Sequence, residues 1–390
     1  MKRADVLILG GGPAGATSAL LLARAGLSVI LCESYATLPE RVCGMYLCPA
    51  GVALLEGLGL HDRVVRDARR LRGMIMVAPN LRRLVTYFPS EDGIPDHGLA
   101  LVRPRLDNTL LEIAREEGAE IRMGARPTTV ERADSGWRAT LAEGEVIEAR
   151  LLIGADGRKS SVARLLGLAL PTRRSRVALH IDRPARFETE PFGQMHVFDD
   201  GAYVGINAVD PETVNLSFVC DPEALRGLPV VNFVNDHIAR SPHLSSLVEP
   251  LPGDAKPGVT FPTNARVRSA ATDDAALVGD ASGYVDPLTG EGIYGALWTA
   301  DELARCVSTK WHDLPAALAS YASLRARRSR AKAALCEVFQ SIISRPWLAN
   351  SALRLLSQRQ NVADSFIGIV GNSYSPGRGF ARIAQHAFAF

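Results

Sequence analysis

Three glycines near the start of the chain, Gly10, Gly12 and Gly15, stand in a GxGxxG arrangement. Glycine permits a tight turn at the first position, a close backbone approach to a pyrophosphate at the second, and close helix–strand packing at the third. Glu33 follows where a carboxylate can accept hydrogen bonds from a ribose diol. This spacing predicts a dinucleotide site, and at this point both NAD and FAD fit it.

The residues around these glycines have the pattern of a strand–helix–strand unit. Residues 6–9 predict a buried parallel strand, residues 16–25 a helix, and residues 28–32 a second strand. The free N–H groups and the positive dipole end of the helix would face the phosphates. The turns of this unit add three cofactor candidates, which are Pro13, Ala14 and Ser34.

Two further stretches that combine glycine with an acid lie far along the chain. The first is GADG at residues 154–157, at the end of an apolar run. The second is GDASG at residues 279–283, which is followed by DPLTGEGI at residues 286–293. A helix that starts near Gly292 would point its N–H groups at a negatively charged ligand. For Asp156 and Asp280, capping of a loop is the alternative interpretation.

In this order, the three motifs resemble those of FAD-dependent oxidoreductases with the aromatic-hydroxylase fold, and among these the geranylgeranyl reductase family. The resemblance covers roughly residues 1–310 and implies FAD as the cofactor. It implies contacts between FAD and Arg103, Asp156, Gly157 and Asp280. The later motifs add further cofactor candidates, because glycine lets the backbone come close to the flavin ring, and these are Gly279, Pro287, Gly290, Gly292 and Ile293. It also implies that the RVCG stretch lies near the flavin, which adds Arg41, Cys43 and Gly44.

The order of patterns along the chain predicts an α/β fold with a discontinuous Rossmann-like FAD-binding domain. Strand-rich blocks separate the first strand–helix–strand unit from a later strand near Gly279, which predicts an inserted, mainly antiparallel β-sheet substrate domain. A helical C-terminal region follows. The expected bounds are 1–72, 98–172 and 265–312 for the FAD-binding domain, 73–97 and 173–264 for the substrate domain, and 313–390 for the C-terminal region.

Composition limits the other functions. The net charge of +2 gives no reason to expect a nucleic-acid partner, and no apolar run is long enough to cross a membrane. The six cysteines have no spacing typical of disulfides or metal sites, so we expect free thiols, no metal and a cytoplasmic protein. A run of basic residues at positions 325–332 is interpreted as a solvent-exposed helix face.

We expect an FAD enzyme, most simply a monooxygenase that hydroxylates an apolar or aromatic metabolite through a flavin C4a-hydroperoxide. Residues 201–208 lack the aromatic and Phe-Pro pattern of the isoprenoid reductases. The alternatives are a reductase of carbon–carbon double bonds in an isoprenoid or polyketide, and a non-catalytic flavin redox module. Without a second GxGxxG, electrons would come from NAD(P)H bound transiently or from a partner reductase.

The substrate would be a small apolar molecule, and the flavin itself would supply the chemistry. Weak catalytic candidates are Cys43 and Tyr203. Weak candidates for substrate contact lie in the loop and strands expected to face the flavin, and they are Tyr46, His180, Met195, Tyr203 and Asn207. The oligomeric state is left open.

Overall fold

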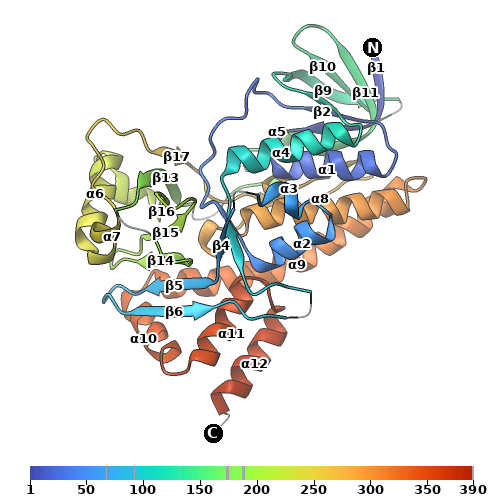
Figure 1. Ribbon diagram of the computed structural model, residues 1–390. Coiled ribbons are helices and arrows are strands. Elements are labelled where there is room, and N and C mark those ends of the chain that lie inside the picture. Colours follow the sequence, from blue (N-terminus) through green and yellow to red (C-terminus); the bar gives the residue numbers. More distant parts are fainter. Residues whose placement is uncertain (67, 92, 135, 173–174, 187–188, 389–390) are drawn as a thin grey trace.

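The computed structural model describes residues 1–66, 68–91, 93–134, 136–172, 175–186 and 189–388. In this described part of the chain, two seven-stranded sheets lie next to each other, and helices from the C-terminal part run beneath both (Figure 1). The fold is the α/β arrangement predicted from the sequence, including the mainly antiparallel second sheet and the helical C-terminal region.

The first sheet is built on a parallel core in the order β8-β2-β1-β11-β19. Its central strands are buried on both faces, as parallel strands covered on two sides are. A hairpin, β10 and β9, extends the sheet by antiparallel pairing with the first half of β11. The bounds are β1 (Lys2–Leu9), β2 (Val29–Cys32), β8 (Glu120–Arg122), β9 (Pro127–Ala133), β10 (Gly136–Leu141), β11 (Val146–Gly154) and β19 (Ala275–Leu277).

Three helices cover one face of this sheet: α1 (Pro13–Arg24), α4 (Arg103–Glu116) and α8 (Gly292–Thr309). The other face packs against Trp137 of β10 and against α5 (Ser161–Leu165). Alternate residues of β1 therefore enter two separate cores. This arrangement brings the carboxyl ends of β1, β2, β11 and β19 to one edge of the sheet.

The second sheet has the strand order β17-β13-β16-β15-β14-β5-β6, in which only the β14–β5 pair is parallel. One face packs on α6 (Val230–Arg240) and α7 (Pro242–Leu247), and the opposite face looks toward the first sheet. The bounds are β5 (Gly73–Val77), β6 (Arg83–Tyr87), β13 (Val177–Pro184), β14 (Gly193–Val197), β15 (Tyr203–Ala208), β16 (Thr213–Cys220) and β17 (Gly258–Thr260).

Small elements connect these layers. A three-stranded sheet has the order β3-β7-β4, and β12 pairs with β18. The bounds are β3 (Tyr46–Leu47), β4 (Arg69–Leu71), β7 (Gly98–Ala100), β12 (Ala169–Leu170), β18 (Arg266–Val267), α2 (Pro49–Gly57) and α3 (His61–Val64), with 3-10 turns at Pro222–Leu225, Gly279–Ser282 and Pro287–Thr289. The domain boundaries stay a prediction, and one of them, at 172/173, adjoins residues outside the described part.

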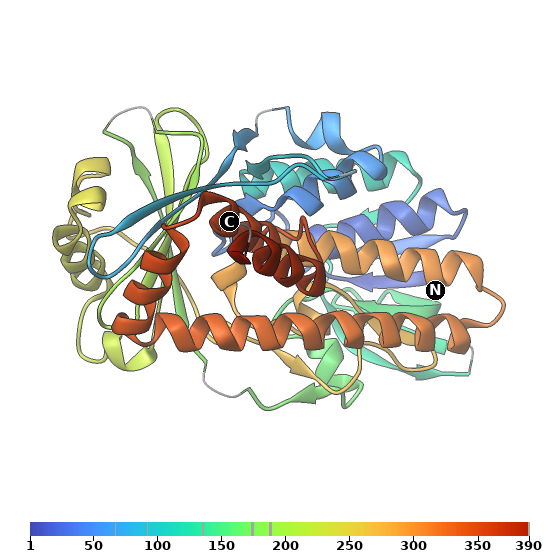
Figure 2. The same cartoon turned by 90° about the horizontal axis from the view of Figure 1, so that it is seen from below.

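The C-terminal region consists of α9 (Leu314–Ile343), α10 (Pro346–Leu356), α11 (Gln360–Val370) and α12 (Pro376–Phe388). At 1.5 Å per residue, α9 is roughly 45 Å long. It runs along the molecule from beside the first sheet to the second (Figure 2). Among the described helices, none is both long and apolar enough to cross a bilayer.

Candidate functional site

A cavity of about 1080 Å³ lies between the two sheets and the C-terminal helices. Of the residues predicted to hold the cofactor, every one except Gly15 lines this cavity. Of the substrate candidates, Tyr46, Met195, Tyr203 and Asn207 line it and His180 does not. The fold therefore brings three motifs that are distant in sequence to one site. The contacts of each residue with a ligand stay predictions.

The first motif forms the turn between β1 and α1, and its three glycines differ in their surroundings. Gly10 has a φ of +113°, and a Cβ there would lie 2.4 Å from the Ala155 carbonyl oxygen. A Cβ at Gly15 would lie 1.9 Å from the Gly10 carbonyl oxygen, so Gly15 permits close helix–strand packing without lining the cavity. At Gly12, a Cβ would meet nothing within 4 Å.

Gly12 is also the N-cap of α1, where no side chain caps the helix and no acid stands in the first turn. The N–H groups and the positive dipole end of α1 are therefore available to an anion in the cavity. This open, uncapped turn fits a pyrophosphate.

Glu33 is buried at the end of β2, with its carboxylate beside the same turn. Oε2 accepts a hydrogen bond from the Gly11 amide at 2.7 Å, and Oε1 accepts from Ser34 Oγ and the Tyr35 amide at 3.0 Å each. A carboxylate offers about four acceptor sites. One site is left for a ribose hydroxyl, so this position fits the adenosine part of FAD.

The Asp156 side chain caps a helix. Its Oδ2 accepts from the Ser161 amide at 2.6 Å and from Ser161 Oγ at 2.7 Å, at the start of α5. The loop-capping alternative therefore describes the contacts that this carboxylate makes. A contact of Asp156 with the cofactor stays a prediction.

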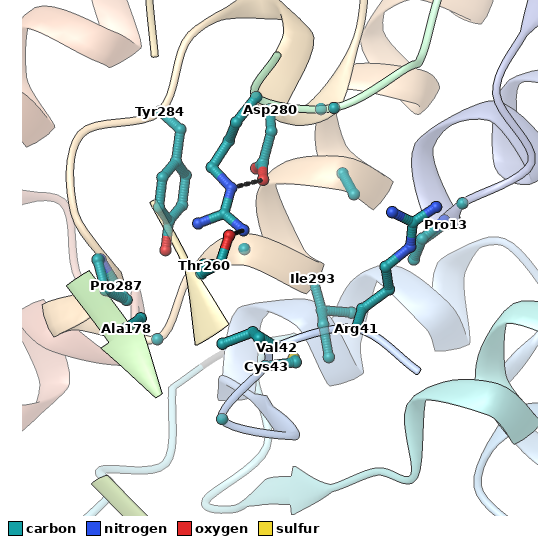
Figure 3. Close-up of a pocket in the computed structure, with 18 of the residues that line it drawn as sticks. Pro13, Arg41, Val42, Cys43, Ala178, Thr260, Asp280, Tyr284, Pro287 and Ile293 are labelled. Carbon is teal, nitrogen blue, oxygen red and sulfur yellow. Dashed lines mark hydrogen bonds and ion pairs between the residues drawn. The ribbon is translucent and has the colours of Figure 1, made fainter. Parts of the chain in front are cut away.

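Asp280, labelled in Figure 3, lies just after β19 and pairs with an arginine that the sequence reasoning missed. Arg158 Nε lies 3.7 Å from Asp280 Oδ2, and Arg158 Nη2 donates to Thr260 Oγ1 at 3.1 Å. Burial raises the pKa of Asp280, while Arg158 and Arg103 oppose part of that rise. Arg158 directly follows Gly157, so its place next to the second motif was the available signal.

The third motif leads into α8 through two glycines. Gly290 has a φ of +63°, and a Cβ there would lie 2.5 Å from the Tyr46 ring. Gly292 begins α8, and its N-cap residue Glu291 makes no side-chain cap. The uncapped N-terminus of α8 thus borders the cavity and can stabilise negative charge on a reduced flavin.

In the loop that carries Cys43 and Gly44, the backbone carbonyl groups form hydrogen bonds with side chains of the second sheet. His180 Nδ1 lies 2.9 Å from the Cys43 carbonyl oxygen, and Ser217 Oγ donates to the same oxygen at 3.2 Å. Asn207 Nδ2 donates to the Gly44 carbonyl oxygen at 2.7 Å. Because strand side chains alternate, these polar residues share one sheet face. His180 and Asn207 therefore position the loop.

Two neighbours extend this polar face. Asn215 Nδ2 donates to Asp182 Oδ1 at 2.8 Å, and Asp182 Oδ2 lies 3.6 Å from His180 Nε2. Burial lowers the pKa of His180, but the hydrogen bond and charge of Asp182 outweigh this effect, so the net shift is upward. The sequence reasoning missed Asp182, Asn215 and Ser217, although each follows the polar alternation of β13 or β16.

The two weak catalytic candidates both line the cavity. Cys43 Sγ accepts from the Met45 amide at 3.3 Å and lies beside Arg103. The Tyr203 hydroxyl donates to Asp286 Oδ1 at 2.9 Å, and burial raises the pKa of both partners. The proton of Tyr203 is thus already engaged by a buried carboxyl group.

Arg103, the first residue of α4, faces the same cavity. Its Nε and Nη2 donate to Asp107 at 3.0 and 2.8 Å, which fixes the guanidinium at the cavity wall. Arg41 also lines the cavity and lies over the Tyr35 ring, 5.3 Å from the ring centre.

An apolar part of the cavity is formed by the C-terminal helices, and the sequence reasoning missed it. We call this part the chamber; its wall includes Phe339, Ile343, Leu353, Leu356, Phe366 and Val370 from α9, α10 and α11. Met74 and Met76 of β5 complete the wall. The apolar side chains were visible in the sequence, but their periodicity does not say whether they face a cavity or a core.

The interpretation of residues 325–332 as a solvent-exposed face was wrong for three of the basic residues. Arg325 Nε donates to Ser282 Oγ at 3.0 Å, Arg328 lies over the Trp298 ring, and Lys332 Nζ lies 2.8 Å from Glu291 Oε1. These partners belong to the third motif and α8, far away in sequence. The remaining two, Arg327 and Arg330, are exposed.

Among the described residues, no group of three or more His, Cys, Asp or Glu side chains could hold a metal ion. The six cysteines are free thiols in the structure, and Cys43 is half-buried.

Comparison with known proteins identifies the family of the chain. Residues 3–336 match the family described as FAD binding domain. Digeranylgeranylglycerophospholipid reductase 1 of Methanothermobacter thermautotrophicus is 30% identical over 312 residues, which cover 75% of this chain and 74% of that protein. Menaquinone reductase of Mycobacterium tuberculosis is 31% identical over 310 residues, with 75% and 74% covered. These matches confirm the resemblance recognised in the sequence.

Among solved structures, PqsL of Pseudomonas aeruginosa, described as "a probable FAD-dependent monooxygenase", superposes with a TM-score of 0.74 at 22% identity. The match covers 90% of this chain and 99% of that one. At this identity the likeness concerns the fold, and it confirms the predicted fold class.

Proposed function

The chain belongs to the FAD binding domain family and is an FAD-dependent oxidoreductase, and from this premise we propose that it saturates carbon–carbon double bonds in an apolar isoprenoid compound. This is the alternative that the sequence reasoning placed second. We now prefer it to hydroxylation.

One observation carries the proposal: the glycines at the cofactor site and the chamber belong to a single continuous cavity. A long hydrocarbon chain gains free energy from burial against apolar walls, roughly 25 cal/mol per Å². The chamber offers such a wall in the same cavity as Gly290 and Gly292, where the flavin ring is expected. The two reductase relatives, whose names refer to geranylgeranyl lipids and to menaquinone, support the same substrate class.

The chain's own residues would bind, orient and exclude water. Bound and reduced FAD would supply hydride chemistry for one alkene carbon, and a group of the chain would supply the proton for the other. Cys43 Sγ is our candidate to hold that proton, because the thiol lines the cavity on a loop fixed by the second sheet. Tyr203 is less suited, since its hydroxyl donates to Asp286. Electrons would arrive from NAD(P)H or a partner reductase.

Hydroxylation, the activity first expected, uses the same fold and stays the second candidate. The match to PqsL favours it at the level of fold only. The two activities differ in their need for oxygen, which makes them separable in one experiment.

The experiment incubates the flavin-loaded protein with NADH or NADPH under argon, with a geranylgeranyl glycerolipid or menaquinone as test substrate. We expect a product two hydrogens heavier without oxygen. A product that forms only in air and carries ¹⁸O from ¹⁸O₂ would refute reduction in favour of hydroxylation.

A matched pair of variants tests the proton donor in the same assay. Cys43→Ser should keep its flavin spectrum yet reduce the alkene about 100-fold more slowly, as loss of a general acid does. Cys306→Ser, on α8 and outside the cavity lining, should behave like the unmodified protein. Equal rates for both variants would remove Cys43 from the mechanism.

A further inference from the structure

Large apolar side chains are exposed on the outward face of α10. Trp347 is 66% exposed and Leu355 is 62% exposed, two turns further along the helix. The tip of the β5–β6 hairpin lies against the same helix, because Asn350 Oδ1 accepts from the Asn80 amide at 3.1 Å. Leu81, which follows Asn80, is 45% exposed and has a left-handed backbone conformation that leucine rarely adopts. Trp347, Leu355 and Leu81 are therefore large, exposed apolar side chains on α10 and on the hairpin tip that contacts it.

The inward face of α10 lines the chamber. Ala352, Leu353 and Leu356 alternate with the exposed residues around the helix and point to the cavity. One helix therefore separates the chamber from an exposed apolar surface. The outer face of α10 combines the two exposed apolar residues Trp347 and Leu355 with polar residues such as Ser351, which is typical of a helix that lies at an interface.

The α10 segment itself carries charge of one sign. Residues 344–360 contain three arginines and no Asp or Glu. Arg345 and Arg354 are exposed beside Trp347 and Leu355. A helix with exposed Trp and Leu flanked by arginines matches the headgroup region of a bilayer, where aromatic rings bury at the interface and arginines meet anionic lipids. We call Leu81, Arg345, Trp347, Arg354 and Leu355 the α10 surface.

We propose that the α10 surface binds an anionic lipid bilayer, and that apolar substrates enter the chamber from that bilayer beneath α10. The entry route depends on the proposed function, whereas lipid binding does not. Because α10 forms both the membrane contact and the chamber wall, a prenyl chain could move between the two without crossing water.

The experiment uses the flavin-loaded protein with phosphatidylglycerol and phosphatidylcholine vesicles, followed by sedimentation. We expect binding to phosphatidylglycerol vesicles that weakens with salt, and much less binding to phosphatidylcholine. Trp347→Ser/Leu355→Ser should bind phosphatidylglycerol vesicles at least about tenfold more weakly, because two large side chains lose their burial. Leu228→Ser, which changes an exposed leucine before α6, is the control and should bind like the unmodified protein.

Three outcomes would overturn the proposal. They are no binding to phosphatidylglycerol vesicles, equal binding of the double variant, and equal binding to both lipids. Light scattering tests a fourth such outcome. If the unmodified protein is a dimer and the Trp347→Ser/Leu355→Ser variant is a monomer, a second copy of the chain, and not a bilayer, covers the α10 surface.

Turnover of a short, water-soluble prenyl substrate separates this proposal from the proposed function. The double variant should reduce that substrate at the unmodified rate. Vesicle binding without any reductase activity would refute the proposed function alone, and reductase activity without vesicle binding would refute the α10 surface alone.

Discussion

At the scale of single residues, the three glycines of the first turn have separable tasks. Gly12→Ala places a methyl group in open space at the start of α1, so the chain should fold normally. The methyl group keeps the pyrophosphate away from the uncapped N–H groups, and we expect FAD affinity to fall at least about tenfold. Titration of the flavin-free protein with FAD, followed by fluorescence, measures this change.

Gly15→Ala is the matched comparison. Its Cβ would lie 1.9 Å from the Gly10 carbonyl oxygen, so the helix must move away from the strand. We expect a loss of about 1–3 kcal/mol in the free energy of unfolding, measured in urea without FAD. If Gly12→Ala lost as much stability as Gly15→Ala, the separation of binding from packing would be wrong.

At the scale of elements, α9 contacts the third motif and stabilises the start of α8. Lys332 of α9 lies 2.8 Å from Glu291, the N-cap residue of α8, and both side chains are largely buried. Lys332→Met leaves the carboxylate without this cation, so we expect the free energy of unfolding to drop by about 1–3 kcal/mol. Urea denaturation at neutral pH measures the loss.

Arg330→Met on the same helix provides the control, because Arg330 is exposed. It should change stability by less than about 0.5 kcal/mol. If both variants lost a similar amount of free energy of unfolding, the Lys332–Glu291 contact would not stabilise the start of α8.

The mistaken interpretation of this helix has a physical cause. Periodicity within α9 places charged residues on its surface, and an isolated helix exposes such a surface to water. Whether that surface meets water depends on Ser282, Trp298 and Glu291, which lie on other elements. Local patterns do not carry this information.

At the scale of the whole molecule, the sequence predicted the cofactor half of the site better than the substrate half. The glycines and Glu33 belong to one strand–helix–strand unit, so their spacing within that unit predicts the turn. The chamber is assembled from β5 and three C-terminal helices. Phe366 and Val370 look the same in sequence whether they fill a core or line a cavity, and only the tertiary arrangement distinguishes the two.

The volume of the chamber should therefore set the length of the substrate. Ala352 lines the chamber from α10, so the larger side chain of Ala352→Phe would take up space in it. We expect KM for a long prenyl substrate to rise about tenfold, while KM for a short one stays unchanged. Steady-state kinetics with both substrates makes the comparison, and flavin content verifies folding. Ser351→Phe, on the exposed side of the same helix, should change neither KM. A uniform loss with both substrates would show that the chamber does not hold the hydrocarbon chain.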